Sequence, residues 1–296
     1  MQESVHLKYL VTSPQDRKIG LTITSIGTQN ICANESYPPL KHPTRYHFDP
    51  EKGRILYEYQ LLILTKGSGL FQSASMNQPA KIKEGDMFLL FPGEWHSYRP
   101  DPDTGWTEYW VGFYGDIAEG WFRNGIISKE HPVFHAGKIE TFGNLYRQAM
   151  ECADKQESGY QQMLCGIVCN LLSSCIYYDK NASFRQDSIQ ELIAKVRRYI
   201  NDNIECASPE GVAAFASVSY SKLRKLFRQY TGLTLGKYIA QVRTNKAKEM
   251  LSNTDYSVGD IASRLNFFNE EYFSTYFKRI TGESPSQYRL RIRQFL

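Results

Sequence analysis

The sequence has 296 residues, enough for two domains, and 42% of them are hydrophobic, so each domain can bury a core. No stretch approaches the roughly 20 apolar residues of a membrane-spanning helix, and residues 1–10 lack the apolar run of a secretory signal. Six cysteines are too few for a disulfide framework in a chain of this length, so we expect a reduced, cytoplasmic protein.

Charge is distributed unequally along the chain. Residues 1–186 contain 18 Lys and Arg against 20 Asp and Glu, whereas residues 187–296 contain 17 against 11. The net charge of +4 is therefore a balance of −2 and +6. A basic C-terminal part indicates an anionic partner, and nucleic acid is the first candidate.

The first part of the chain has the pattern of short strands separated by Gly and Pro turns. Strand-like segments cover residues 20–26, 57–64, 70–75, 87–91 and 106–113. Between them, Gly67-Ser68-Gly69 predicts a hairpin turn, and Gly85-Asp86 and Pro92-Gly93 predict two further turns. Many short strands spaced by roughly 8–12 residues are typical of a β-sandwich or a small barrel.

From residue 139 the apolar spacing becomes helical. Residues 139–149 and 163–176 predict two helices, with a break near Ser158-Gly159. These helices could fold back on the strands or form a dimer contact. Residues 181–188 are polar and predict a linker, so we place one domain at residues 1–180 and another at 189–296.

The C-terminal part shows helical patterns throughout. An apolar stripe runs along residues 189–201, and residues 235–252 predict one longer helix. Ser208 followed by Pro209 predicts a helix start, and Ser257 with Asp260 resembles a capping box.

One pattern occurs twice in this part. Phe227-Arg228-Gln229-Tyr230-Thr231-Gly232 recurs 50 residues later as Phe277-Lys278-Arg279-Ile280-Thr281-Gly282, and Tyr238 recurs as Tyr288. Each copy follows a short apolar pair, Val212-Ala213 or Ile261-Ala262, and a turn. The repeat predicts two helix-turn-helix units joined by a helix.

A helical wheel divides the second helix of each unit into an apolar and a polar side. We expect burial of Leu223, Leu226, Phe227 and Tyr230 in the first unit and of Phe273, Tyr276, Phe277 and Ile280 in the second. The polar sides carry Ser221, Lys222, Arg224, Lys225 and Arg228 in the first unit and Glu271, Tyr272, Ser274, Thr275 and Lys278 in the second. A generic helical bundle would bury the same positions, but the duplication and the basic charge favour two helices that read the major groove of DNA.

The connecting helix has a suitable length for this purpose. Residues 235–252 would span about 27 Å, comparable to the roughly 34 Å between helices that enter successive major grooves. Arg243 and Lys246 on this helix are predicted to contact phosphates.

Residues 190–293 resemble the tandem helix-turn-helix domain of AraC/XylS-type bacterial transcription regulators. The resemblance rests on residues 213–232, on Lys246-Ala247-Lys248-Glu249-Met250-Leu251 and on residues 261–288. That family usually has glycine at the turn of each motif, where this chain has Ser217 and Asn266, so we expect left-handed residues and a slightly strained first turn. Glu270 and Glu271 open the second recognition helix, so we expect the first unit to dominate base readout and Glu271 to accept from cytosine.

A looser resemblance links residues 61–113 to the cupin-type ligand-binding domain of sugar-responsive members. It implies an α+β protein, with a cupin-like β-barrel and two following helices, then an all-α tandem helix-turn-helix domain. The positions that match the family's pocket are His96, Tyr98, Glu108, Trp110 and either Arg54 or Arg45. Such residues suit a sugar, since Trp stacks on the ring while Tyr, Glu and Arg bond hydroxyls, although Tyr98 and Trp110 could also be ordinary core.

Two alternatives accompany this interpretation. A metal-dependent cupin enzyme would have at most His47, Glu58 and His96 as ligands, without a His-x-His pair, so we expect no enzyme, no metal and no cofactor. In the other alternative, the barrel only dimerises. The main prediction is a sugar-responsive activator of carbohydrate-use genes that binds double-stranded DNA as a homodimer. We expect residues 139–178 to form the contact between the two subunits. We also expect a contact with RNA polymerase and none with a membrane.

Overall fold

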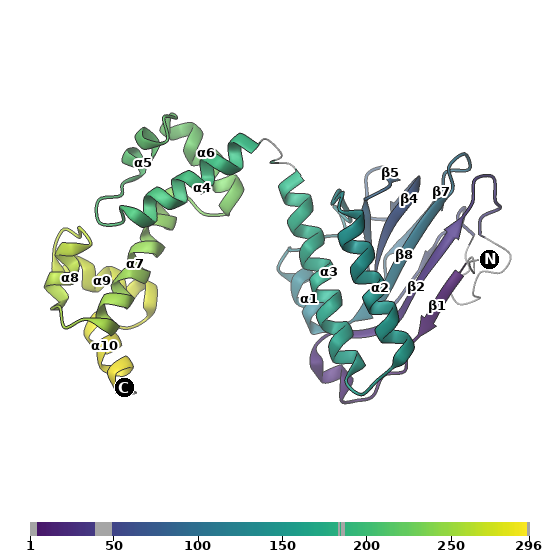
Figure 1. Cartoon of the computed structure of the whole chain (residues 1–296), viewed down its shortest axis with the longest axis horizontal. Coiled ribbons are helices and arrows are strands. Elements are labelled where there is room, and N and C mark those ends of the chain that lie inside the picture. The colour runs from purple at the N-terminus through teal and green to yellow at the C-terminus, as the bar shows by residue number, and fades with distance from the viewer. Residues whose placement is uncertain (1–4, 39–48, 183, 185–186, 295–296) are drawn as a thin grey trace. The chain divides into compact units, whose positions relative to one another are not determined.

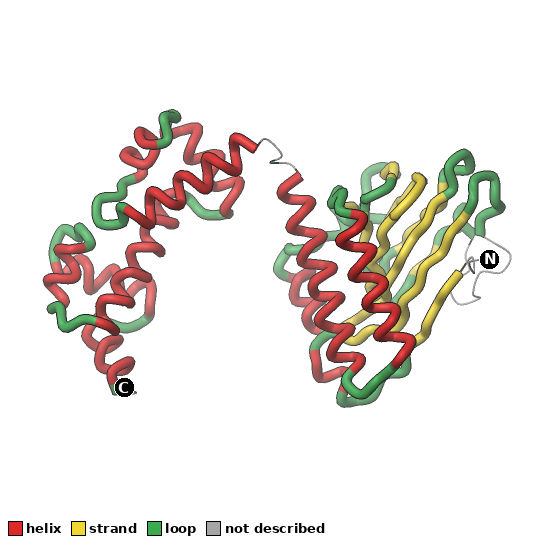
Figure 2. Tube along the Cα trace, viewed as in Figure 1, coloured by secondary structure: helices red, strands yellow, loops and turns green. Residues whose placement is uncertain are grey.

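The computed structural model describes residues 5–38, 49–182, 184 and 187–294. The chain divides into two compact units, Met1–Ser183 and Phe184–Leu296 (Figure 1). The described elements of the first unit are an antiparallel sheet with helices, and those of the second unit are all helices (Figure 2). The predicted α+β class is confirmed. None of the described helices is long and apolar enough to cross a membrane.

The long strand β4 (Tyr59–Ser73) organises the sheet because it passes from one layer to the other. Its first half pairs with β6 (Met87–Leu90) and β8 (Trp106–Tyr114). Its second half pairs with β5 (Ala80–Lys83) and β7 (Trp95–Pro100). The first layer has the order β1-β2-β8-β4-β6-β9, and β3 pairs with β7 in the second. The remaining strands are β1 (Val5–Tyr9), β2 (Thr22–Ile31), β3 (Arg54–Ile55) and β9 (Val133–Phe134).

The predicted hairpin turn at Gly67-Ser68-Gly69 is wrong, because β4 continues straight through it. Gly67 has a φ of +82°, and a Cβ there would lie 2.0 Å from the carbonyl oxygen of Gly105. Glycine is needed at this point for the close approach of two backbones, not for a chain reversal. The turns at Gly85 and Gly93, with φ of +86° and +70°, are confirmed.

Two helices cover one face of the first layer (Figure 1): α2 (Ile139–Lys155) and α3 (Tyr160–Ala182). The Tyr146 hydroxyl donates to the carbonyl oxygen of Leu61 at 2.8 Å, which ties α2 to β4. The buried Gln161 amide accepts from the Ile23 N–H at 3.1 Å and donates to its carbonyl at 3.0 Å, where the β2–β8 register shifts. The two predicted helices and the break at Gly159 are confirmed.

Several elements differ from the sequence expectation. β1, β3, β9, a 3-10 turn at Asp16–Ile19 and α1 (Asp116–Arg123) were not expected. Helix α3 extends to Ala182 and α4 begins at Asp187, so both ends of the predicted linker 181–188 are helical among its described residues. Its polar residues are compatible with a helix end, where Asn181 Nδ2 donates to the carbonyl oxygen of Tyr177 at 2.7 Å.

The second unit consists of two helix groups that share α7 (Leu235–Asn253), which is the predicted connecting helix. The first group packs α4 (Asp187–Asp202), α5 (Pro209–Phe215) and α6 (Tyr220–Thr231) against the start of α7. The second packs α8 (Val258–Arg264), α9 (Glu270–Thr281) and α10 (Pro285–Arg293) against its end. The predicted helix starts at Ser208 and at the Ser257–Asp260 capping box are confirmed.

The repeated residues close the end of each recognition helix. The Thr231 hydroxyl donates to the carbonyl oxygen of Phe227 at 2.7 Å. Gly232 and Gly282 adopt left-handed φ values of +75° and +86°. The Tyr238 ring packs edge-on against Phe227, with ring centroids 5.2 Å apart. The repeated residues therefore maintain the same helix packing in both units, whereas the outward-facing residues differ between them.

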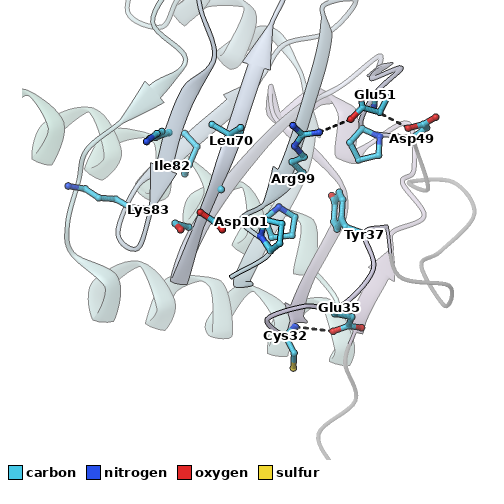
Figure 3. Close-up of a pocket in the computed structure, with 16 residues that line it drawn as sticks. Cys32, Glu35, Tyr37, Asp49, Glu51, Leu70, Ile82, Lys83, Arg99 and Asp101 are labelled. Carbon is cyan, nitrogen blue, oxygen red and sulfur yellow. Dashed lines mark hydrogen bonds and ion pairs between the residues drawn. The ribbon is translucent and has the colours of Figure 1, made fainter. Parts of the chain in front are cut away.

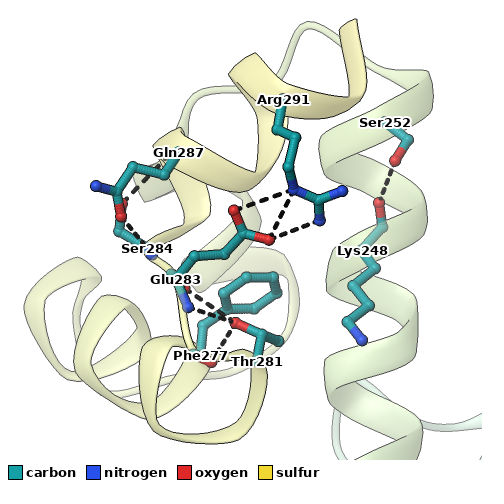
Figure 4. A network of polar contacts seen from close by, with 8 residues as sticks. All are labelled: Lys248, Ser252, Phe277, Thr281, Glu283, Ser284, Gln287 and Arg291. Atoms are coloured by element: carbon teal, nitrogen blue, oxygen red, sulfur yellow. Dashed lines mark hydrogen bonds and ion pairs between the residues drawn. The ribbon is translucent and has the colours of Figure 1, made fainter. Parts of the chain in front are cut away.

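The second copy repeats these contacts and adds an ion pair (Figure 4). Thr281 donates to the carbonyl oxygen of Phe277 at 2.8 Å, and Tyr288 packs edge-on against Phe277 at 5.6 Å. The Glu283 carboxylate accepts three hydrogen bonds from Arg291, the shortest at 2.6 Å, which join the α9–α10 turn to α10. The Glu283 carboxylate therefore neutralises the positive charge of Arg291 on the surface of the second unit.

The predicted apolar sides are buried, with one exception. Leu223, Phe227, Phe273 and Phe277 are fully buried, and Leu226, Tyr230 and Tyr276 are partly buried. Ile280 is instead 43% exposed, so its predicted burial is wrong. Its counterpart Tyr230 is covered by the Phe184 ring at 5.2 Å and by the Arg197 guanidinium at 5.7 Å, contacts that depend on the chain at and before α4.

Candidate functional sites

A left-handed residue sets the turn inside each helix-turn-helix unit. Ser217 has a φ of +56° and Asn266 a φ of +52°, which confirms the predicted conformation at both positions. Asn tolerates this conformation better than Ser because its side chain can bond locally. The turn of the first unit is therefore the more strained of the two.

Helix α6 presents an uninterrupted basic face. Ser219 caps the helix by accepting from the Lys222 N–H at 3.4 Å. The predicted contact residues are all exposed: Ser221, Lys222, Arg224, Lys225 and Arg228. Among the described residues, none of these four cations forms an ion pair with a carboxylate. Their charges are available to an anionic ligand such as the DNA backbone.

Helix α9 has a mixed character. Asn269 caps it by accepting from the Tyr272 N–H at 2.7 Å. Its predicted contact residues are exposed at Glu271, Tyr272, Thr275 and Lys278 and half-buried at Ser274. Two carboxylates in its first turn offset two basic residues in its last turn, whereas α6 has four basic residues and no acidic one. The two helices therefore offer different chemistry to DNA.

The two cations predicted on α7 have partners within the protein. Arg243 turns inward, and its Nη2 donates to the carbonyl oxygens of Ile204 at 3.3 Å and Ala207 at 3.1 Å. Its guanidinium also lies 5.6 Å from the Phe267 ring, and burial lowers the pKa of the group. The prediction that Arg243 meets phosphate therefore fails, because the side chain joins the two helix groups. Lys246 remains exposed and pairs with Glu249 at 3.0 Å.

This inward role makes a testable prediction for Arg243. Arg243→Ala should destabilise the second unit by about 1–3 kcal/mol, because it leaves buried carbonyl groups without a charged donor. The helical transition seen by circular dichroism should shift to lower temperature. Lys246→Ala, which removes the same charge from an exposed pair, is the control and should leave the transition unchanged. If the Arg243→Ala protein is as stable as wild type and only the salt dependence of DNA binding is reduced, the predicted contact between Arg243 and phosphate would be supported instead.

The predicted pocket residues of the first unit lie together between the two sheet layers. The Arg54 guanidinium donates to His96 Nε2 at 3.3 Å and to the Tyr98 hydroxyl at 2.6 Å. His96 Nδ1 lies 3.1 Å from the carbonyl oxygen of Glu94, so the ring fits a neutral form that donates there and accepts from Arg54. Sequence reasoning thus grouped residues that β3 and β7 hold side by side.

Buried polar atoms without partners lie at the neighbouring strands. Glu108 on β8 is 3% exposed and Gln29 on β2 is 1% exposed, and the two residues face each other across the strand pair. Among the described residues, Glu108 Oε2, both amide atoms of Gln29 and Trp106 Nε1 have no hydrogen-bond partner. Burying such atoms unpaired is costly, so they mark a place for a polar ligand or water.

Gln29 was missed by the sequence analysis. Strand alternation was the available signal, since Gln29 shares the inward face with Ile31, but the predicted strand ended at residue 26. Trp110, a predicted pocket residue, is 6% exposed and packs in the same interior cluster as Trp106 and Tyr98. The interior is therefore aromatic with a few polar groups, a combination typical of small-molecule sites.

Burial changes the protonation of two of these groups in opposite directions. Removal from water raises the pKa of Glu108 to about 8, although the Arg54 charge acts against this rise. Burial and the Arg54 charge lower the pKa of His96 to about 4. Near pH 7 Glu108 is mostly protonated and His96 is neutral.

Two residues of the sequence analysis, Arg45 and His47, lie outside the described residues. Of the proposed metal set, Glu58 accepts from Thr24 at 2.6 Å and from Gln60 at 3.2 Å, while His96 contacts Arg54. In the part of the chain that the structure describes, no three His, Cys, Asp or Glu side chains are grouped as metal ligands.

A cavity of about 810 Å³ lies beside this polar interior (Figure 3). Its lining comes from segments 32–37, 49–51, 68–70, 81–83 and 99–102. Arg99 pairs with Glu51 at 2.7 Å on its rim. Tyr37 lines the cavity and also contacts Trp106 edge-on, with centroids 6.3 Å apart, so it connects the cavity to the interior. None of the predicted pocket residues that the structure describes lines this cavity.

Two family models match this chain. One, described as a helix-turn-helix domain, matches residues 212–291, and the other, described as an AraC-like ligand binding domain, matches residues 35–166. The chain belongs to the AraC-type transcription regulators. This AraC-type regulator therefore combines a DNA-binding domain with a ligand-binding domain. The prediction that the protein is a transcription regulator and not an enzyme is confirmed.

Known relatives resemble the AraC-type regulator along most of its length. The MmsAB operon regulatory protein of Pseudomonas aeruginosa is 26% identical over 80% of this chain and 76% of its own. The arabinose operon regulatory protein of Salmonella typhimurium is 27% identical over 78% of this chain and 83% of its own. The lactose operon transcription activator of Staphylococcus xylosus is 26% identical over 77% of this chain and 82% of its own.

Proposed function

We propose that this AraC-type regulator binds a sugar between its sheet layers and, as a homodimer on DNA, activates genes of carbohydrate use. The observation that carries this proposal is the set of unpartnered buried polar atoms on Gln29 and Glu108 in an aromatic interior. Sugar hydroxyls can satisfy such atoms while Trp106 or Trp110 stacks on the ring. Two relatives are named for the arabinose and lactose operons, which supports a sugar over other small molecules.

Calorimetry with a panel of pentoses, hexoses and disaccharides tests the ligand. At least one sugar should bind the wild-type protein. Glu108→Leu should abolish that binding, because the sugar hydroxyl loses the carboxyl group that bonds it. Glu51→Gln, on the rim of the neighbouring cavity, should bind the sugar normally. If no sugar binds, the first unit acts as a dimerisation module instead.

On the DNA side, we propose that the exposed residues of α6 make most of the base contacts and those of α9 fewer. The four exposed cations of α6, which form no ion pair within the described part of the chain, support this division. Affinity should fall steeply with salt through counterion release. RNA polymerase is the partner that activation requires.

We further propose that α3 forms the homodimer contact. Between residues 163 and 177 its exposed side carries Met163, Gly166, Asn170, Ser173 and Tyr177, which are spaced by three and four residues and include no charge. This spacing is that of a seam between two helices. The outward side of α2, by contrast, is largely polar and charged, which suits solvent.

Asn170 lies midway along this seam, so a charge there tests the contact. Asn170→Glu should convert a dimer into a monomer at micromolar concentration, because like charges would meet in the contact. Sedimentation velocity measures the change. Arg147→Glu, an exposed change on α2, should leave the dimer intact. A dimer that survives Asn170→Glu but not Arg147→Glu would place the contact on α2.

A further inference from the structure

The turns of the two helix-turn-helix units start at equivalent points. Val218 donates its backbone N–H to the carbonyl oxygen of Ala213 at 3.2 Å, and Phe267 donates to Ala262 at 2.9 Å. Each residue directly follows the left-handed residue of its turn. Val218 and Phe267 are therefore structural counterparts, and they lie 49 residues apart.

The turns then differ by one residue. Ser219 follows Val218 directly and caps α6, whereas Asn269, which caps α9, is the second residue after Phe267. The offset between the units changes here from 49 to 50 residues. The residue that the second turn has in addition is Phe268.

Phe268 points into solvent although it is aromatic. Its exposure of 92% is the highest among the large apolar side chains of the described residues. The preceding Phe267 turns inward and packs on Phe273 at 4.9 Å and on Tyr276 at 5.3 Å, so the turn itself is anchored. Phe268 thus places an apolar ring in solvent next to a turn that Phe267 anchors.

The place of this ring decides what it can meet. Single exposed apolar residues are ordinary on protein surfaces, but Phe268 directly precedes the cap of a recognition helix. Residues at the N-terminal end of such a helix reach base edges in the major groove. Tyr272, on the first turn of α9, is also 56% exposed, so a second aromatic side chain is available at this end.

The first turn of α9 cannot read guanine as α6 can. It carries Glu270 and Glu271 where α6 has Tyr220 and Ser221, and Tyr272 stands in place of Lys222. Carboxylates cannot donate to the guanine acceptors. In the major groove thymine alone presents a methyl group, which apolar side chains contact. An aromatic ring beside two carboxylates therefore matches thymine better than guanine.

We propose that Phe268 contacts the 5-methyl group of a thymine, so that the second helix-turn-helix unit reads thymine through apolar contact while the first reads through cations. This assignment rests on the proposed entry of α9 into the major groove.

Uracil substitution isolates this contact, because deoxyuridine lacks only the methyl group. Duplexes that bind the full chain are selected from a random pool, and each thymine is then replaced singly by deoxyuridine. Fluorescence anisotropy should show wild-type affinity falling about 3- to 5-fold at one or two thymines in the half-site of α9. Phe268→Ala should weaken binding of the unsubstituted duplex by a similar factor and remove the sensitivity at those positions.

Matched variants separate the possible outcomes. Phe268→Leu should keep part of the deoxyuridine effect, and Tyr57→Ala, which removes a ring that is 90% exposed in the first unit, should keep all of it. Tight binding of the selected duplexes with no deoxyuridine effect in wild type would overturn the thymine contact while leaving DNA recognition intact. Failure to select any duplex would refute the proposed DNA recognition itself. Loss of transcription with unchanged DNA affinity in Phe268→Ala would also overturn the contact and indicate a protein partner.

Discussion

Simultaneous alanine substitution of Arg224 and Lys225 should weaken binding to a selected DNA duplex by about 3 kcal/mol, more than 100-fold. Both side chains are exposed on α6 and have no carboxylate partner among the described residues, so no internal interaction is lost. The loss should fall mainly on specific sequences, and base preference should relax. Anisotropy titrations with selected and scrambled duplexes measure both effects.

The equivalent positions of the second unit provide the control. Ser274→Ala with Thr275→Ala should weaken binding by less than 1 kcal/mol, because neutral hydroxyls contribute less than cations. The dependence of affinity on salt should become shallower only in the first double variant. Equal footprints for wild type and the Arg224–Lys225 variant would contradict the assignment of α6 as the main reading helix.

The first unit should lose about 1 kcal/mol of stability between pH 6.5 and pH 8. Glu108 has a folded pKa of about 8 against an ordinary value of 4.5, so rising pH ionises the unfolded carboxyl first and penalises the fold. His96 has a folded pKa of about 4 against 6.5, so it penalises the fold as pH falls below 6.5. Between pH 4.5 and 6.5 the contributions of Glu108 and His96 to the free energy of unfolding change in opposite directions, so the stability of the first unit should be nearly independent of pH.

Tryptophan fluorescence measures this profile selectively, because all four tryptophans lie in residues 1–183. In urea titrations, Glu108→Gln should remove the loss above pH 6.5 while leaving the decline at acid pH. Glu51→Gln, which alters an exposed carboxylate, should keep the wild-type profile. A wild-type protein equally stable at pH 6.5 and pH 8 would contradict the buried, protonated Glu108.

Periodicity predicted most of the architecture from the sequence, because strand and helix patterns depend on local burial. It failed where a residue's role depends on distant backbone. Gly67 has the pattern of a turn, and only its closeness to Gly105 in space reveals that two backbones approach each other here. Arg243 has the pattern of an exposed cation, and only the carbonyl groups of Ile204 and Ala207 turn it inward.

The candidate sites show the same division. The basic face of α6 follows from helical spacing, so the sequence predicts its exposure correctly. Gln29 was missed because its strand continues beyond the alternating segment. Phe268 was detectable in principle, since the offset between the repeats changes from 49 to 50 residues, but its exposure depends on how Phe267 packs.

We propose that a sugar in the first unit controls how the second unit binds DNA. Control of this kind requires a ligand that favours one of two states by differential affinity. Footprinting of the full chain on a selected duplex, with and without the sugar found by calorimetry, is the most direct test. The protected half-sites or their affinity should change with sugar in wild type and remain unchanged in Glu108→Leu. Identical footprints and affinities with and without a bound sugar would contradict control of DNA binding by the sugar.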